Sequence, residues 1–169
     1  SHLGRPEAGN FDLKFSLKPV AKKLSELLNQ EISFTQSIED ASFKSTISVL
    51  ENTRFLIGEL ENDIDLSQKL GSMAEVYVFD AFGTSHREQA STFGAIHQAN
   101  ISCAGLLLEQ EVEALSRATQ SNEKPLLSIV GGSKISTKLE VLRNLSKFSD
   151  HIIPGGGITN TFLKAQGFN

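Results

Sequence analysis

The chain has 169 residues, of which 39% are apolar and 21% charged, so it can form one ordinary domain plus part of another and is too apolar for a disordered segment. Its formal net charge of −4 excludes a broadly basic surface for nucleic acid, although a small basic pocket remains compatible with it. A single cysteine, Cys103, predicts no internal disulfide and a reducing, cytosolic location, and no signal peptide or membrane span is expected. We expect no metal site, because the histidines lack metal-ligand spacing. A start at Ser1 without methionine indicates a trimmed chain or an excerpt.

The first part of the chain alternates helical and strand patterns. Apolar residues recur at helical spacing over 16–29, with Ser16 as the expected N-cap and Pro19 in the first turn. Short apolar, β-branched runs predict strands, and longer amphipathic runs predict helices. The further elements expected here are strands at 31–34, 45–52 and 75–83, with helices at 65–74 and 105–119.

The second part repeats one pattern twice, a strand followed by a glycine turn and a helix. A polar break at 120–125 precedes it and predicts a domain boundary near residue 122. The elements expected are strands at 126–132 and 151–154, with helices at 133–148 and 158–167. Alternating helices and continuously apolar strands predict an α/β fold, a three-layer, Rossmann-like arrangement with a parallel sheet covered by helices on both faces.

Ligands of parallel sheets bind beyond the carboxyl ends of the strands, so the cations in those loops are candidate binding residues. Guanidinium groups match the oxygens of phosphates and carboxylates, and a cluster of them in an acidic chain indicates a small anionic, phosphorylated ligand. The candidates that follow predicted strands or stand at the chain start are His2, Arg5, Arg54, His86 and Arg87. Ordinary surface ion pairs, Arg54 with Glu59 and Arg87 with Glu88, remain the alternative.

The segment "GGSKISTK" places two glycines and two lysines where a strand is expected to pass into a helix. Gly131 and Gly132 would let backbone N–H groups approach a phosphate, and the helix N-terminus would add favourable partial charge. Lys134 and Lys138 are spaced to share one face of the first helical turn. A tight turn with solvated lysines is the alternative, since the spacing fits no phosphate-loop or dinucleotide pattern.

The segment "PGGGITNTF" carries three successive glycines after a predicted strand. Gly155, Gly156 and Gly157 would allow the backbone to lie flat against a planar ligand such as a nucleotide base. A close strand-to-helix connection explains the same glycines equally well.

Taken in order, these segments resemble phosphoglycerate kinase from end to end. The motifs that carry the resemblance are "SHLGRP", "SLKPVAKKL", "LENTRF…GE…ND", "VYVFDAFGTSHR", "CAGLLLEQE", "IVGGSKISTKLEVL" and "GGGITNTFLKAQG". The resemblance implies a two-lobed cytoplasmic, monomeric glycolytic enzyme that, with Mg²⁺, transfers a phosphoryl group from 1,3-bisphosphoglycerate to ADP, giving 3-phosphoglycerate and ATP. It implies no nucleic acid or membrane partner.

The resemblance also implies roles for individual residues. The five cations above would hold 3-phosphoglycerate, with Arg5 and Lys134 catalytic, and Lys134 would bridge the transferring phosphoryl group. Lys138 would hold nucleotide phosphate, Gly131 and Gly132 would line the nucleotide site, and glycines 155–157 would lie against adenine. The protein ligand for the metal would lie outside this chain.

The sequence departs from the family pattern at several places. Its first strand and most of the nucleotide lobe are missing, the segment before Arg54 is short, and Phe79 and Gln89 stand where many members carry Asn and His. We therefore expect residues 1–122 to form most of the substrate lobe, residues 123–169 to begin the nucleotide lobe, and the 169 residues alone to be inactive. A non-catalytic fragment or degenerate homologue that binds an anionic metabolite or a protein is the alternative.

Overall fold

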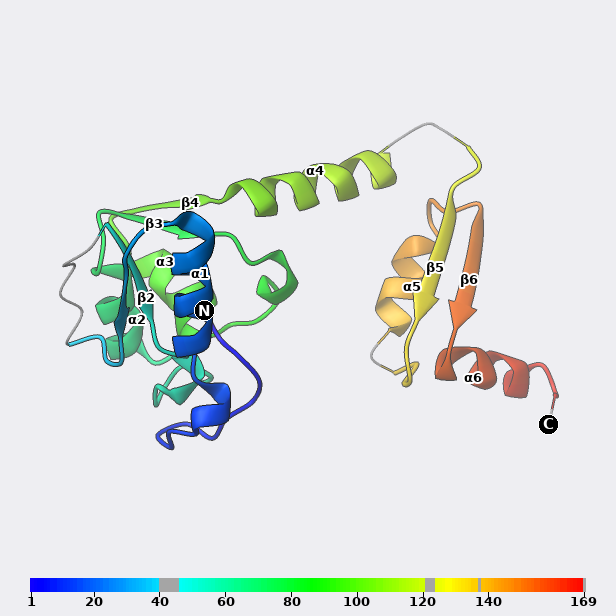
Figure 1. The fold of residues 1–169 in the computed structure, drawn as a ribbon. Helices are drawn as coiled ribbons and strands as arrows, with labels where there is room; N and C mark the ends of the chain where they lie inside the picture. The colour runs from blue at the N-terminus through cyan, green and yellow to red at the C-terminus, as the bar shows by residue number, and fades with distance from the viewer. Residues whose placement is uncertain (40–45, 121–123, 137, 169) are drawn as a thin grey trace. The chain divides into compact units, whose positions relative to one another are not determined.

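A computed structural model describes residues 1–39, 46–120, 124–136 and 138–168 (Figure 1). The chain forms two compact units, Ser1–Gln110 and Glu111–Asn169. The domain boundary expected near residue 122 lies outside the described residues and stays a prediction. Across the described ranges, no helix combines the length and apolar character that a membrane span requires.

The first unit alternates helices with short strands, as the sequence predicted. Its helices and strands are α1 (Lys18–Leu28), β1 (Ile32–Thr35), β2 (Ile47–Leu50), α2 (Ile64–Gly71), β3 (Val76–Phe79), α3 (Ala95–Gln98) and β4 (Ile101–Ala104). Single turns of 3-10 helix are η1 (Leu13–Phe15), η2 (Thr53–Phe55) and η3 (Phe82–Thr84), and a π-helical turn is η4 (Ala90–Gly94). Strand β4, helix α3 and these short helical turns were not expected from the sequence.

Strand pairing in this unit is parallel, which confirms the predicted α/β class. β1 pairs with β2 from Ile32–Ile47 to Thr35–Leu50, and β3 pairs with β4 over the four residues of each strand. Burial alternates along β3, with Val76 and Val78 exposed, whereas continuous burial was expected. The core of the unit lies instead around Leu66, Leu70, Ala90 and Ala95, where α2, η4 and α3 pack together.

Helix α1 begins one residue later than predicted, because Leu17 and not Ser16 occupies the N-cap. Pro19 lies in the first turn, as expected. Ser16 Oγ accepts a hydrogen bond from the N–H of Lys18 at 3.2 Å, but the same hydroxyl donates to the buried Glu51 Oε2 at 2.6 Å. Ser16 is therefore committed to a contact far along the chain, and the helix begins after it.

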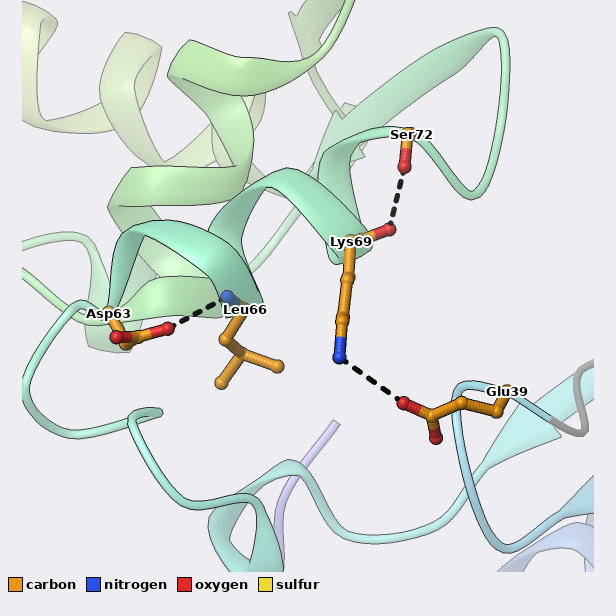
Figure 2. Close-up of polar contacts among 5 residues, drawn as sticks. All are labelled: Glu39, Asp63, Leu66, Lys69 and Ser72. Carbon is orange, nitrogen blue, oxygen red and sulfur yellow. Dashed lines mark hydrogen bonds and ion pairs between the residues drawn. The ribbon is translucent and has the colours of Figure 1, made fainter.

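Helix α2 is capped and braced by local polar contacts (Figure 2). The Asp63 carboxylate accepts a hydrogen bond from the N–H of Leu66 at 2.9 Å, which satisfies one of the free donors of the first turn. Lys69 forms an ion pair of 3.4 Å with Glu39, and Ser72 Oγ donates to the Lys69 carbonyl at 3.1 Å (Figure 2). This capping starts the helix one residue earlier than predicted.

Helix α4 (Leu106–Gln120) crosses the boundary between the units. The carboxylate of Asp80, directly after β3, accepts a hydrogen bond from the N–H of Leu108 at 2.7 Å. The Gly105 N–H donates to the Phe79 carbonyl at 2.9 Å. These two bonds attach the start of α4 to the carboxyl end of β3.

The second unit repeats the strand-to-helix pattern twice. It contains β5 (Leu127–Gly131), α5 (Leu139–Leu145), β6 (His151–Gly155) and α6 (Gly157–Ala165). β5 and β6 pair in parallel, and Val130, Leu142 and Ile158 form a small core. Burial alternates along β5, where Ile129 is exposed, rather than being continuous as expected.

The helix predicted over 133–148 is wrong in its first part, because α5 begins at Leu139. The Ser133 backbone lies so close to Gly157 that a Cβ on Gly157 would come within 2.7 Å of the Ser133 carbonyl oxygen. Ile135 packs against the core, and its carbonyl accepts the N–H of Lys138 at 2.8 Å in a turn. These contacts hold the described residues from Ser133 to Ser136 outside the helix.

Candidate anion-binding site

The first residues of the chain lie along η2, at the carboxyl end of β2. Asn52 Nδ2 donates to the Leu3 carbonyl at 2.8 Å, and the N–H of Thr53 donates to the Ser1 carbonyl at 3.0 Å. Arg54 Nη1 donates to the Gly4 carbonyl. Three successive residues after the strand therefore fix the segment that carries His2 and Arg5.

Arg54 is buried without a carboxylate partner among the described residues. It is only 8% exposed, and its Nε is buried and has no hydrogen-bond partner in the part of the chain that the structure describes. The ion pairs between described residues all use lysine: Lys14–Asp12, Lys23–Glu26, Lys69–Glu39 and Lys124–Asp150. The alternative of ordinary pairs from Arg54 to Glu59 and from Arg87 to Glu88 is therefore wrong, and Arg54 retains donors for another acceptor.

Four of the five expected cations influence one another electrostatically. Burial lowers the pKa of Arg54, and the charges of Arg87 and Arg5 lower it further. Burial also lowers the pKa of His2, with added effects from Arg54 and Arg87. We call His2, Arg5, Arg54 and Arg87 the cation cluster. His86 is exposed in the loop after η3, and no described contact brings it to Arg54.

Beside the cation cluster lies a carboxylate that the sequence analysis did not single out. Glu51 is 4% exposed, and its oxygens accept hydrogen bonds from Ser16 Oγ at 2.6 Å, the Leu17 N–H at 2.7 Å and the Asn52 N–H at 2.8 Å. These bonds join the start of α1 to the end of β2. Two polar residues, Glu51 and Asn52, directly after an apolar strand are the signal that could have indicated this junction.

In the second unit, local packing or backbone conformation requires glycine at some positions but not at others. Gly156 has a φ of +64°, and Gly157 packs against the Ser133 backbone, so local packing explains both. Nothing lies within 4 Å of a Cβ added at Gly131, and the nearest atom at Gly155 is 3.8 Å away. Gly132 contributes its carbonyl, which accepts the Ile158 N–H at 3.1 Å. Among the described residues of this unit, no internal contact explains the small size of Gly131 or of Gly155.

The two candidate lysines do not share the first turn of a helix, which corrects that expectation. Lys134 is exposed in the segment between β5 and α5, and Lys138 occupies the N-cap position of α5. The Lys138 side chain lies near Gly132, because its Cγ is 4.0 Å from the position of a Cβ there. The described ranges contain no group of three or more His, Cys, Asp or Glu side chains that could hold a metal ion.

Parallel strands that alternate with helices define an α/β protein, and the cation cluster gives its first unit the parts of an anion site. The family model of phosphoglycerate kinase matches residues 1–169. The chain belongs to the phosphoglycerate kinase family.

Known relatives agree with this family. The phosphoglycerate kinase of Francisella tularensis subsp. holarctica is 50% identical over 171 residues, covering 100% of this chain and 44% of its own length. The solved phosphoglycerate kinase from Coxiella burnetii is 49% identical with a TM-score of 0.85, and 44% of it is covered. The solved phosphoglycerate kinase from Pyrococcus horikoshii is 31% identical with a TM-score of 0.81, and the match covers 99% of this chain and 45% of the Pyrococcus chain. The chain thus spans less than half the length of the relatives it matches.

Proposed function

We propose that this chain is part of an enzyme that transfers a phosphoryl group between 1,3-bisphosphoglycerate and ADP, giving 3-phosphoglycerate and ATP in glycolysis. The observation that carries the proposal is the cation cluster around the buried Arg54, which lacks a carboxylate partner among the described residues. Family membership supplies the reaction. Residues 1–122 are assigned to the substrate lobe and residues 123–169 to the start of the nucleotide lobe, in a cytoplasmic monomer.

The substrate side follows from the charge of the cluster. Burial lowers the pKa of His2 and of Arg54, and neighbouring cations lower both further, so an anion placed among them would relieve this repulsion. 3-Phosphoglycerate carries both a phosphate and a carboxylate, and guanidinium groups can bind either one with two hydrogen bonds. In this proposal His2, Arg5, Arg54 and Arg87 bind and orient the substrate, and His86 joins them from the neighbouring loop.

The nucleotide side lies in the second unit. Lys134 neutralises charge on the transferring phosphoryl group, and Lys138 binds a nucleotide phosphate near Gly132. Gly131, Gly132 and glycines 155–157 allow close approach of the nucleotide, and Gly131 fits this role because no described residue fills its space. Mg²⁺ would enter with the nucleotide and neutralise phosphate charge; the described residues offer it no ligand set of their own.

Phosphoryl transfer requires positioning and charge stabilisation by both lobes, so the proposal places activity in the longer protein. A calorimetric titration of the purified chain with 3-phosphoglycerate tests the substrate side. We expect saturable binding that Arg87→Ala weakens, and no turnover in a coupled ATP-formation assay. Turnover within a hundredfold of a complete relative, or a complete lack of 3-phosphoglycerate binding, would contradict the proposal. Binding of a protein instead would favour the alternative of a non-catalytic homologue.

A further inference from the structure

A second buried carboxylate, Glu59, lies on the loop that follows Arg54. It is 2% exposed. Its Oε2 accepts the N–H of Ser91 at 3.0 Å, and its Oε1 accepts the Ser91 hydroxyl. The Glu59 carbonyl also accepts the N–H of Ala90 at 2.9 Å. One residue thus fixes the first two residues of the π-helical turn η4 through three hydrogen bonds.

Further hydrogen bonds connect the start of η4 to strand β3 and to Arg87. The Tyr77 hydroxyl, on β3, donates to the Ser91 carbonyl at 2.7 Å. Thr92, the next residue, donates from Oγ1 to the Arg87 carbonyl at 2.7 Å. Since Ser91 is anchored on both sides, the backbone of Arg87 is held to an anchored segment.

Backbone hydrogen bonds also connect Glu59 to the turn that contains Arg54. The Glu59 N–H donates to the Leu56 carbonyl at 3.3 Å, and the Leu56 N–H donates to the Thr53 carbonyl at 3.0 Å, across that turn. A continuous series of hydrogen bonds therefore leads from the Arg54 turn through Glu59 and Ser91 to Arg87. The two arginines lie far apart in the sequence, so no local contact could set their spacing.

We propose that Glu59 is a positioning residue that fixes Arg87 relative to Arg54 and thereby sets the affinity of the cation cluster for its anion. The identity of that anion as 3-phosphoglycerate rests on the proposed function. Glu59 acts through its hydrogen bonds to Ser91 and not by touching the ligand.

A test separates positioning from simple stabilisation. Glu59→Ala should reduce 3-phosphoglycerate affinity at least tenfold. In Glu59→Gln the amide oxygen can still accept the Ser91 N–H, and its NH2 group can donate to the Ser91 hydroxyl oxygen, so affinity should return to within about threefold of the original. Thr92→Val removes the bond to the Arg87 carbonyl and should weaken binding with little change in the denaturant midpoint. Glu61→Ala, which removes an exposed glutamate from the same loop, is the matched control and should bind normally.

A second measurement, by NMR, needs no ligand. In the ligand-free chain, the NMR signals of the Arg54 and Arg87 Nε–H groups should shift in Glu59→Ala and Thr92→Val but not in Glu61→Ala. If these signals and the affinity both stay unchanged in Thr92→Val and in a folded Glu59 variant, the positioning role is wrong. If the original chain does not bind 3-phosphoglycerate, the proposed function fails, and the ligand-free signals still decide the positioning role.

Discussion

The Arg54 guanidinium donates a hydrogen bond from Nη1 to the carbonyl oxygen of Gly4, a residue 50 positions earlier in the chain. Gly4 has a φ of +65°, and the ring of Phe15 occupies the space in which a Cβ would lie. The glycine of the "SHLGRP" segment thus lets the backbone reach Arg54. This contact places Arg5 beside Arg54 and joins the chain start to the end of β2.

Gly4→Ala should destabilise the first unit. The left-handed backbone disfavours a side chain, and Phe15 would have to move, so we expect the free energy of unfolding to fall by about 1–3 kcal/mol. Urea unfolding measures this change. Gly83→Ala is the matched control, because nothing lies within 4 Å of a Cβ at that position. Equal stability of the two variants would show that the contact with Arg54 does not depend on glycine.

Arg87→Ala should weaken binding of 3-phosphoglycerate to the chain. A lost charge-assisted contact costs about 1.5–3 kcal/mol, or roughly 10- to 150-fold in the dissociation constant. Isothermal titration calorimetry provides the measurement. Lys22→Ala removes an exposed charge from α1 and should leave the constant nearly unchanged. A similar loss in both variants would mean that net charge, not the cluster, attracts the ligand.

Binding of 3-phosphoglycerate should raise the pKa of His2. Burial and the charges of Arg54 and Arg87 lower this pKa below 6.5 in the folded chain, so the unfolded chain takes up the proton first as the pH falls. The contribution of His2 to stability is therefore present above pH 6.5 and is lost as the pH falls through the folded pKa. A bound anion opposes the charges of the nearby arginines and therefore raises the pKa of His2.

NMR titration of the His2 ring signals, with and without ligand, tests this expectation. Glycerol, which is uncharged, serves as the control and should leave the pKa where it is. A His2 titration that does not respond to saturating 3-phosphoglycerate would place the anion away from His2.

The glycines of the second unit should separate into two kinds. Gly157→Ala should lower stability, because its Cβ would meet the Ser133 backbone. Gly131→Ala should leave stability within about 0.5 kcal/mol, as for substitutions that meet no neighbour, but should reduce ADP affinity if the nucleotide approaches this backbone. Thermal unfolding and an ADP titration together distinguish the two. Normal ADP binding by Gly131→Ala would remove Gly131 from the proposed nucleotide site.

Glu51→Gln should disrupt the junction between α1 and β2. An amide cannot accept from Ser16, Leu17 and Asn52 with both of its terminal atoms, so a buried donor would lose its partner at a cost of about 1–3 kcal/mol. The exposed Glu26, changed to Gln, is the control. Chemical denaturation should show a lower midpoint for Glu51→Gln alone, and similar midpoints would contradict the structural role of the three bonds.

The sequence by itself determined most of the strands and helices and their order, the α/β class and the family. These depend on local patterns: apolar periodicity defined α1, α2, β5 and α6 to within a few residues, and ordered motifs such as "LENTRF" carried the resemblance. The position of Arg54 after a strand was also visible, because strand ends can be recognised locally.

Only the tertiary structure decided the contacts between distant residues. The start of α5 moved to Leu139 because Ser133 packs on Gly157, and β4 became a strand because it pairs with β3, although its own pattern is weak. The hydrogen bonds that Ser91 donates to Glu59 join positions 32 residues apart. Such bonds leave no periodic signal in the sequence, since their partners are chosen by the folded backbone and by the need to satisfy buried polar groups.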